Sequence, residues 1–259
     1  MYQNYKQLHV EKQDKLVVVK FNNPKKKNCV NRVAYGEIAR VLQEAGQDDS
    51  TTLVVFTGVG DFYTAGNDLS QSSDIEDMNV YIRESNEIFK NMVRSFIECP
   101  KIIVSLVNGP CIGIGTTLAG ISDLVWCSET AYFSAPFVKL GIVPEAGSSY
   151  LFPLLMGRSK ASEVLLFGER LSAQEAYNFN FASRIYKHSE VDSVIWPKLR
   201  EFAELPPQSL QISKRLIRSE EKKALLHAID VECEELVQRF GSEEFMNALI
   251  QFTMRKSKL

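Results

Sequence analysis

"KIIVSLVNGPCIGIGTTLAG", residues 101–120, joins an apolar run to a helical pattern through a loop of small residues. The β-branched start of this stretch predicts a strand that is buried on both faces. Glycines after a strand let backbone N–H groups approach a ligand without a Cβ in the way. At the start of a helix such N–H groups are unpaired and lie at the positive end of the helix dipole. The stretch therefore predicts an α/β fold whose loop could hold an anion, and a plain strand-to-helix turn is the alternative.

Strands and helices are predicted on both sides of this stretch. We expect strands at 15–21, 51–58, 101–109 and 123–128, and helices at 33–45 and 80–97. Strands that alternate with helices imply a largely parallel α/β core. From about Ser148 the pattern is almost entirely helical, with helices expected at 172–179, 191–205, 207–218 and 222–252. We therefore expect an α/β core over residues 1–200 and a helical C-terminal region over 201–259.

The composition excludes several classes of protein. The chain has 259 residues, of which 45% are hydrophobic, enough for one large core. A net charge of −2 argues against a broad basic surface for nucleic acid. No apolar run approaches the roughly 20 residues needed to span a bilayer. The cysteines and histidines are scattered without zinc-type spacing, so we expect free thiols and no metal site.

A second loop of small residues, "TGVGDFYTAGNDLS" at 57–70, follows another predicted strand. Neither loop continues with the Gly-Lys-Ser/Thr of a phosphate loop. The pair Gly113 and Gly115 also lacks the third glycine of a dinucleotide fingerprint, so the sequence gives little support for a nucleotide cofactor. If the two loops converged on one oxygen, they would form an oxyanion hole for an enolate or a tetrahedral adduct.

The stretch "GIVPEAGSSYLF", residues 141–152, contains a single carboxylate, Glu145. Its neighbours favour an ordinary acid in the first turn of a helix, because Pro144 suits the first helical position and glutamate suits the positive end of the dipole. The alternative is a catalytic base. The aromatic and Met residues near the C-terminus are expected to be packing residues, in part against other subunits, rather than a cofactor box; they are Phe240, Phe245, Met246 and Phe252.

Several segments resemble the enoyl-CoA hydratase/isomerase (crotonase) family. "DFYTAGNDL" at 61–69 and residues 101–153 are similar to the two halves of its signature, and residues 168–186 resemble the segment that follows. The resemblance covers nearly the whole chain from about Lys15 onward, with the motifs in family order. Within the family, "GNDL", "NGP", "PEAGSSY" and the final "SKL" are most similar to peroxisomal Δ3,Δ2-enoyl-CoA isomerases. The implied fold is a crotonase-like spiral of ββα units with a helical C-terminal oligomerisation region.

The resemblance also implies a set of substrate contacts. The backbone N–H groups of Asn67 and Ile114 would hold the thioester oxygen. Ala65, Gly66, Asp68 and Leu69, together with Asn67, would line the edge along which the pantetheine of coenzyme A runs. Further substrate contacts are expected at Gly113, Phe137 and Lys27. A solvated basic turn at 25–27 is the alternative reading of the lysines. Coenzyme A is part of the substrate, so no separate cofactor is expected.

The positions of the catalytic glutamates differ between family hydratases and isomerases, so they indicate which reaction the resemblance implies. Family hydratases use two glutamates, and the matching positions here are Thr117 and Phe137, so efficient hydration is not expected. The family isomerases place their single glutamate at the position of Glu145. One carboxylate can take a proton from C2 and return one to C4, through a dienolate held at the thioester oxygen. A dry pocket bordered by Phe137 and Ile142 would raise the pKa of Glu145.

The implied activity is thus conversion of cis- or trans-3-enoyl-CoA to trans-2-enoyl-CoA in β-oxidation of unsaturated fatty acids. Two alternatives stay open: a weak hydratase or thioester hydrolase, with Asp68 or Glu129 as a second acid, and a non-catalytic acyl-CoA-binding module. The resemblance implies a homotrimer or hexamer. The floor of the acyl pocket could include Tyr81, Phe89 and Phe96.

The C-terminal end of the sequence, unlike the N-terminal end, matches a targeting signal. Ser257, Lys258 and Leu259 match the peroxisomal address that an import receptor reads, so we expect this receptor as a partner and the peroxisomal matrix as the location. The polar residues 1–15 predict neither a signal peptide nor a transit peptide. Because the first family strand is expected near Lys15, we also expect no acyl-CoA-binding domain ahead of it.

Overall fold

A central parallel sheet organises the molecule. The computed structural model describes residues 1–69 and 77–256, so the predicted targeting tripeptide at 257–259 lies outside the described residues. The sheet contains, in spatial order, β1 (Leu8–Gln13), β2 (Leu16–Phe21), β3 (Leu53–Gly58), β4 (Ile102–Val107), β6 (Leu124–Ser128) and β9 (Arg184–Tyr186). All neighbours from β2 to β9 pair in parallel, and β1 pairs antiparallel to β2. The predicted α/β class and the four predicted strands are confirmed.

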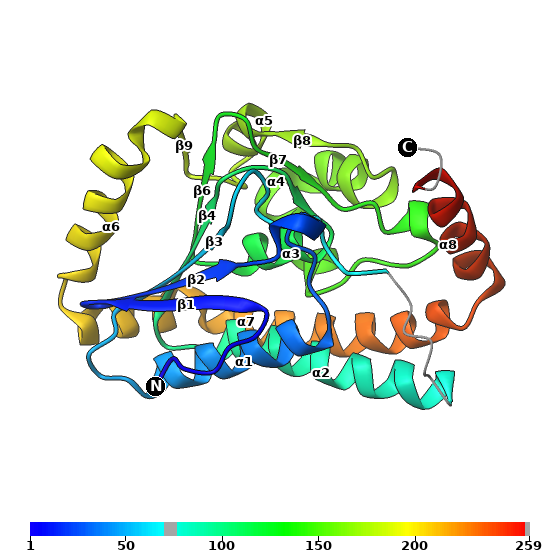
Figure 1. The fold of residues 1–259 in the computed structure, drawn as a ribbon, viewed down its shortest axis with the longest axis horizontal. Helices are drawn as coiled ribbons and strands as arrows, with labels where there is room; N and C mark the ends of the chain where they lie inside the picture. Colours follow the sequence, from blue (N-terminus) through cyan, green and yellow to red (C-terminus); the bar gives the residue numbers. More distant parts are fainter. Residues whose placement is uncertain (70–76, 257–259) are drawn as a thin grey trace.

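Helices cover both faces of this sheet (Figure 1). One face packs on α1 (Arg32–Gln47), α2 (Met78–Glu98) and α7 (Pro207–Phe240), and the other on α6 (Trp196–Ala203). Because side chains alternate along a strand, Val17 and Val19 lie in the larger core, whereas Leu16 lies in the smaller core under α6. The near-continuous apolar strands follow from burial on both faces.

A second, smaller layer lies beyond the carboxyl ends of β3 and β4. Its sheet contains β5 (Cys111–Ile112), β7 (Tyr132–Ser134) and β8 (Leu171–Ser172). The helices of this part are α3 (Ile114–Ile121), α4 (Ser148–Leu166) and α5 (Ala173–Asn178). Short 3-10 turns at Pro24–Lys26, Val138–Leu140 and His188–Glu190 and a π turn at Val191–Ile195 connect the elements.

The structure corrects the predicted elements at several places. The region after Ser148 contains β8 and β9 in addition to helices, and β1 was not expected in the polar N-terminus. β1 is an edge strand with half-exposed residues, so it lacks the apolar run of the buried strands. The helices expected at 207–218 and 222–252 are instead one long helix, α7, followed by α8 (Glu243–Lys256) after a break at Gly241 and Ser242. Cys111 and Cys127 are buried, as their apolar surroundings predict.

The C-terminal helices pack into the same core as the sheet. Four side chains of α7 belong to the larger core; they are Leu225, Ile229, Cys233 and Leu236. The boundary expected between residues 200 and 201 stays a prediction. Among the described helices, none combines the length and the apolar character that crossing a membrane requires.

Candidate active site

The two glycine-containing loops meet where the sequence analysis expects an oxyanion hole. Thr64 of the first loop forms a parallel bridge with Cys111 of the second, and the N–H of Ile112 donates to the Thr64 carbonyl oxygen at 3.0 Å. A Cβ on Gly66 would lie 3.0 Å from the carbonyl oxygen of Ile112, and one on Gly113 would lie 3.8 Å from the Cα of Gly66. Both glycines have positive φ, +90° and +57°. The loops therefore touch at positions that favour glycine.

The two residues that follow these glycines have unpaired backbone N–H groups. Val30 donates to the carbonyl of Gly66 and accepts from the N–H of Asp68, so the N–H of Asn67 points to the opposite side. Ile114 is the first residue of α3, where no N–H has a partner within the helix. Neither N–H donates to any residue that the structure describes. Both N–H groups can therefore donate to a bound molecule.

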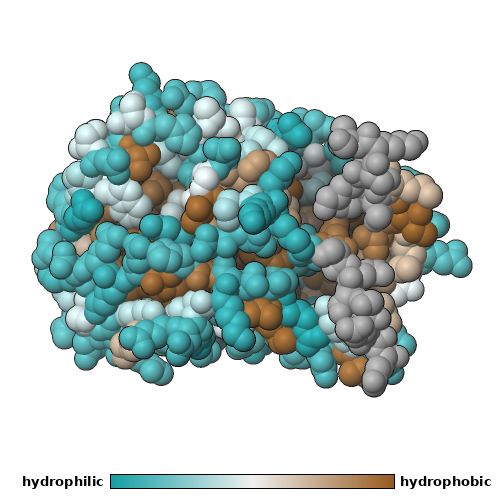
Figure 2. Space-filling model, in the orientation of Figure 1, coloured by the Kyte–Doolittle hydropathy of each residue, from teal (hydrophilic) through white to brown (hydrophobic). Residues whose placement is uncertain are grey.

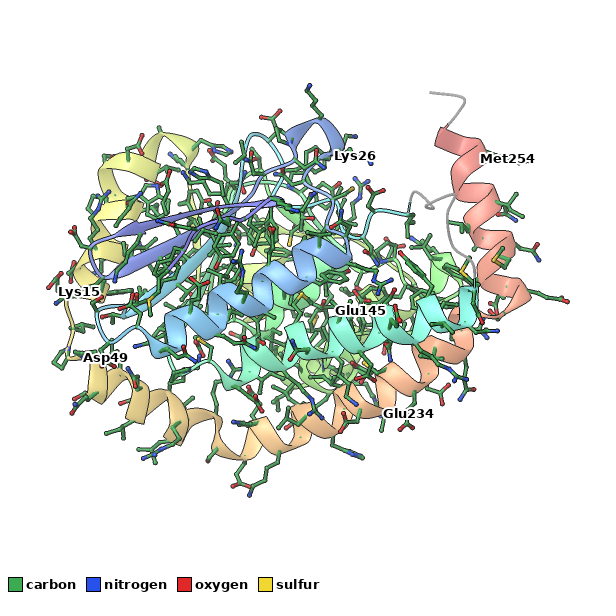
Figure 3. The ribbon with its side chains drawn as sticks, turned by 60° about the horizontal axis from the view of Figure 1, so that its bottom comes forward. Lys15, Lys26, Asp49, Glu145, Glu234 and Met254 are labelled. Atoms are coloured by element: carbon green, nitrogen blue, oxygen red, sulfur yellow. The ribbon has the colours of Figure 1, made fainter. Side chains whose placement is uncertain are left out.

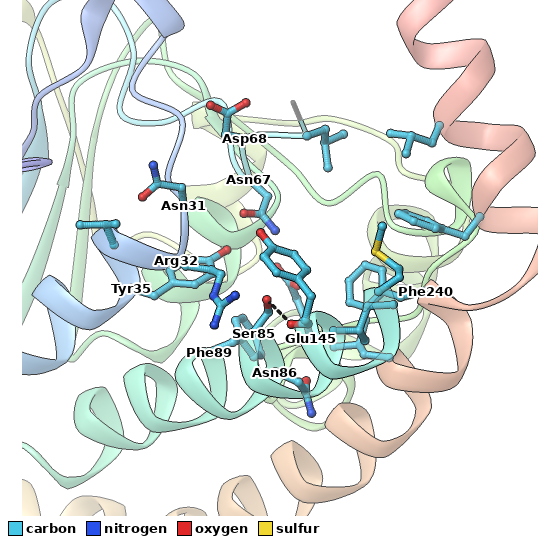
Figure 4. A pocket seen from close by; sticks show the side chains of 18 of the residues that line it. Asn31, Arg32, Tyr35, Asn67, Asp68, Ser85, Asn86, Phe89, Glu145 and Phe240 are labelled. Atoms are coloured by element: carbon cyan, nitrogen blue, oxygen red, sulfur yellow. Dashed lines mark hydrogen bonds between the residues drawn. The ribbon is translucent and has the colours of Figure 1, made fainter. Parts of the chain in front are cut away.

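A cavity of about 580 Å³ opens beside Asn67. Its wall comes from α1, the 67–69 loop, α2, the Glu145 segment, α7 and α8 (Figure 4). The polar lining side chains come from α1, the loop, α2 and Glu145, and those of α7 and α8 are apolar. The lining residues from the last two helices are Leu236, Phe240, Phe245, Met246 and Leu249. The rings of Phe240 and Phe245 pack edge to face with centroids 5.1 Å apart.

Glu145 lies inside the molecule, in the region covered by α1 and α2, whereas Lys26 and Met254 lie at its periphery (Figure 3). The side chain lines the cavity, the residue is only 8% exposed, and its carboxyl accepts no hydrogen bond from the described residues. Burial raises the pKa of Glu145 to about 8, and the nearby carboxylate of Glu232 acts in the same direction. A buried carboxyl with free lone pairs and a pKa near neutrality can act as a general base.

The local prediction of a helix start at Glu145 is wrong. α4 begins three residues later, at Ser148, because Ala146 and Gly147 have left-handed φ values of +57° and +76°. Glu145 therefore lies before the helix, at the start of a turn in which the N–H of Ser148 donates to its carbonyl oxygen, and its side chain lines the cavity.

Comparison with known proteins identifies this arrangement. Residues 11–258 match the family described as enoyl-CoA hydratase/isomerase. The chain belongs to this family. The family that the sequence resembles is thus confirmed. The crotonase fold is confirmed as well, since a crystal structure of an enoyl-CoA hydratase/isomerase from Pseudoalteromonas atlantica superposes with a TM-score of 0.87 at 31% identity. That match covers 96% of this chain and 98% of the other.

Some curated relatives of this family member are named as isomerases. Enoyl-CoA delta isomerase 2 of Homo sapiens is 42% identical over 98% of this chain and 65% of its own length. Enoyl-CoA delta isomerase 3, peroxisomal, of Mus musculus is 37% identical over 98% of this chain and 80% of its own length. The chain thus spans about two thirds of the length of the human relative.

The cavity brings together some of the residues that the crotonase resemblance implies. Asn67, Asp68, Leu69 and Glu145 line it. Gly66 and Gly113 contact each other where the two loops meet, and neither these glycines nor Ala65 and Ile114 are part of the lining. Of the three aromatic residues considered for the acyl pocket, Tyr81 and Phe89 line the cavity, whereas Phe96 is buried against Phe56 with ring centroids 5.0 Å apart.

Phe137 and Ile142 are not among the residues that line the cavity. Phe137 is 2% exposed and belongs to the larger core, and Ile142 packs against that core. The side chains that keep the Glu145 cavity apolar are instead those of α2, α7 and α8. Burial does raise the pKa of Glu145, but the apolar side chains around it come from other elements than the sequence suggested.

The basic turn lies beside the first loop. The ammonium group of Lys26 pairs with the Asp68 carboxylate at 2.8 Å, and that of Lys27 lies 5.2 Å from the centre of the Phe62 ring. Both lysines are exposed, so they are accessible to a phosphate group. Asp68 therefore shares the cavity wall with Glu145 as a paired acid.

The two positions that carry glutamates in family hydratases have no acid function here. Thr117 is fully buried and its hydroxyl donates to the Ile114 carbonyl oxygen at 3.1 Å. Phe137 occupies the other position. Glu129 is exposed and does not line the cavity. No described residue thus supplies a second unpaired carboxylate near Glu145.

Sequence reasoning missed the contribution of α1 and part of α2. Tyr35 points from α1 into the cavity (Figure 4), and its buried hydroxyl has no hydrogen-bond partner among the described residues. Arg32 lies 4.6 Å from the centre of the Tyr81 ring and pairs with Glu84 at 3.1 Å. The Ser85 hydroxyl donates to the Tyr81 carbonyl oxygen, the dashed line of Figure 4. The amphipathic pattern of α1 predicts only that such residues face inward.

Proposed function

We propose that this chain is a Δ3,Δ2-enoyl-CoA isomerase that converts cis- or trans-3-enoyl-CoA to trans-2-enoyl-CoA. The observation that carries the proposal is one buried, unpaired carboxyl, Glu145, in a cavity beside two loops with unpaired N–H groups. The names of the human and mouse relatives support the same reaction. Thr117 and Phe137 at the hydratase positions argue against hydration.

The proposed chemistry needs one base and one oxyanion site. The Glu145 carboxylate removes a proton from C2, and the C2–H bonding electrons delocalise through the C3–C4 double bond and the thioester as a dienolate. The negative charge rests on the thioester oxygen, which accepts from the N–H groups of Asn67 and Ile114. Glu145 then returns the proton to C4, which leaves the double bond between C2 and C3. The substrate and the product have the same atoms, and no water is consumed.

The raised pKa of Glu145 suits this step. A base with a pKa of about 8 holds an abstracted proton more firmly than an ordinary carboxylate, while part of it is ionised near neutral pH. The thioester and the alkene both acidify the C2 proton, so the pKa of the C2–H group is closer to that of Glu145. The isomerisation rate is then expected to rise with pH as Glu145 ionises.

The rest of the cavity fits an acyl-CoA. The apolar end formed by Phe240, Phe245 and Met246 would hold the acyl chain, since apolar walls take up an alkyl chain from water. Coenzyme A would extend along residues 65–69 toward Lys27, whose charge suits a phosphate group. The proposal requires no cofactor beyond the coenzyme A of the substrate.

We further propose that the protein works in the peroxisomal matrix as a homotrimer or hexamer, in β-oxidation of unsaturated fatty acids. The name of the mouse relative and the tripeptide Ser257, Lys258 and Leu259 support this location and a contact with the import receptor. Exposed apolar side chains on α4 and α7 support assembly.

The decisive experiment gives trans-3-hexenoyl-CoA to the purified wild type and to Glu145→Gln. Formation of 2-enoyl-CoA is followed directly, and 3-hydroxyacyl-CoA is assayed in the same samples. We expect rapid isomerisation with little hydroxyacyl product, and a loss of about 10²–10⁴-fold in kcat for the variant. Glu129→Gln, an exposed glutamate outside the cavity, is the matched control and should retain full activity.

Two results would contradict the proposal. Activity that is indifferent to Glu145→Gln would remove Glu145 from the mechanism. An inactive wild type that still binds the acyl-CoA, measured by calorimetry, would favour the acyl-CoA-binding module over the enzyme.

A further inference from the structure

A second buried carboxylate, Glu232 of α7, lies next to the Glu145 segment and has no part in the proposed chemistry. It is 6% exposed. One of its oxygens accepts from the N–H of Gly147 at 2.6 Å, and the other accepts from the N–H of Ser149 at 2.9 Å. These two donors belong to the start of α4, where the helix has unpaired N–H groups. Glu232 therefore serves as a cap for α4 from another helix.

The turn at residues 146–147, which Glu232 contacts, has an unfavourable backbone conformation. Ala146 and Gly147 both have left-handed φ values, and Ala146 is a residue type that rarely adopts them. Gly147, the residue before the helix, has no side chain with which to cap it, and a Cβ there would lie 2.7 Å from the Leu225 side chain of α7. Contacts from outside the segment must therefore stabilise this turn. Glu145 is the residue immediately before it.

We propose that Glu232 is a positioning residue for Glu145: through the N–H groups of Gly147 and Ser149 it holds the turn that directs the Glu145 carboxyl into the cavity. This inference rests on the proposed function, in which Glu145 is the base. It adds a role for a residue that does not touch the cavity and lies 85 positions away from the turn.

The charge of Glu232 gives the proposal a second, measurable consequence. Two backbone N–H donors at a helix start stabilise its ionised form, although burial raises its pKa. A negative Glu232 makes a second negative charge on Glu145 less favourable, so the pKa of Glu145 is raised. The other ionisable groups around the pair come from α1, α2, α7 and the first loop; they are Arg32, Tyr35, Asp68, Tyr81, Lys90, Arg94, Asp230 and Cys233.

The test compares Glu232→Gln and Glu232→Asp with the wild type. The first variant removes the charge and one acceptor, and the second retains the charge on a shorter side chain. Glu37→Gln is the matched control, because Glu37 is 7% exposed, accepts three backbone N–H groups and does not line the cavity. The measurements are kcat and KM from pH 5.5 to 9.5, and the titration of ¹³C-labelled glutamate carboxyls by NMR in the substrate-free protein.

Charge and position predict different results for the two variants. In Glu232→Gln we expect kcat to fall on the order of tenfold with little change in KM, and the acidic limb of the pH profile to move down by about one pH unit. In Glu232→Asp kcat should fall while the acidic limb stays near that of the wild type. Glu37→Gln should change neither quantity. A folded Glu232→Gln with the kcat and the acidic limb of the wild type would overturn the proposal.

The NMR titration separates this proposal from the proposed function. If the wild type shows no isomerisation, the function fails, but a lower pKa of Glu145 in Glu232→Gln would still support the coupling of the two residues. If the variants do not fold, the wild type decides: Glu232 must ionise at lower pH than Glu145. The opposite order would overturn the proposal.

Discussion

Glu145 affects the stability of the fold as well as the proposed chemistry. Its folded pKa of about 8 lies above the ordinary value of 4.5, because the carboxyl is buried without a hydrogen-bond donor among the described residues. Between these two pH values the folded protein retains a proton that the unfolded chain has lost. The free energy of unfolding therefore falls as the pH rises from about 4.5 to about 8, and the contribution of Glu145 is least favourable above pH 8.

The fall in stability with rising pH leads to a prediction for Glu145→Gln. The neutral amide removes the buried charge, so the variant should be more stable than the wild type at pH 9 by a few kcal/mol and much closer to it at pH 5. Urea unfolding at both pH values measures the two differences. An equal difference at pH 5 and pH 9 would show that the carboxyl does not titrate with a raised pKa in the folded state.

Sequence could identify Glu145 but not the residues that act on it. The motif around it resembles the family signature, so a role for this position follows from the local residues together with the resemblance. Tyr35 lies in an amphipathic helix whose pattern predicts that it faces inward. The helix that contains Glu232 has almost no amphipathic pattern, so nothing local predicts that this acid is buried. That Glu232 reaches the start of α4 depends on how α7 crosses α4, which local sequence does not encode.

The contact between the two loops gives a prediction at the level of elements. Gly113 has φ +57° and ψ −124°, a conformation that is essentially restricted to glycine. We expect Gly113→Ala to shift the N–H of Ile114, to lower kcat by about tenfold or more, and to destabilise the fold by about 1–3 kcal/mol. Steady-state kinetics and urea unfolding measure the two effects.

Gly36→Ala is the control for this substitution. Gly36 lies inside α1 with open space around its Cα, so alanine there should stabilise the helix by about 0.5–1 kcal/mol and leave kcat unchanged. Wild-type kcat in Gly113→Ala would mean that the N–H of Ile114 does not hold the oxyanion.

The strength of the local pattern decided which elements could be predicted. The β-branched runs of β2, β3, β4 and β6 are buried on both faces, so their apolar pattern is continuous. β1 is a half-exposed edge strand, and β9 has only three residues. Neither gives a clear pattern. α7 appeared divided because its solvent-exposed stretch near 218–222 is strongly charged, although the helix continues through it.

The outer surface of the whole chain carries apolar side chains that a single copy leaves in water. Figure 2 shows hydrophobic residues at the end of the molecule where α8 lies. On α7, Leu216 is 70% exposed and Ile217 is 81% exposed, and Phe167 at the end of α4 is 64% exposed. Burial of one such side chain stabilises an interface by about 1.5–3 kcal/mol.

We therefore predict that the wild type sediments as a trimer or hexamer and that Ile217→Lys shifts it toward smaller species. Glu220→Lys, a substitution at an exposed position of the same helix, should leave the assembly intact and serves as the control. Analytical ultracentrifugation at micromolar concentration measures both. A wild type that sediments as a monomer would contradict the proposed assembly.

At the scale of the whole molecule, the fold class was within reach of the sequence and the cavity was not. Alternating strands and helices, together with the family motifs, are sufficient for the crotonase fold. The cavity wall extends from Asn31 to Leu249 and needs the packing of six separate segments. Phe137 and Ile142, which the sequence suggested for the wall, are therefore not among the residues that line the cavity.

The hydrogen bonds from Gly147 and Ser149 to Glu232 also constrain how such proteins can be recombined. A chimera that takes residues 1–200 from one relative and the last helices from another would separate the turn from its acceptor. Unless both parents have the same acid at this place, the hybrid would contain Glu145 and its turn without the two hydrogen bonds to α7. Chimeras of this fold should therefore exchange the turn and α7 as one unit.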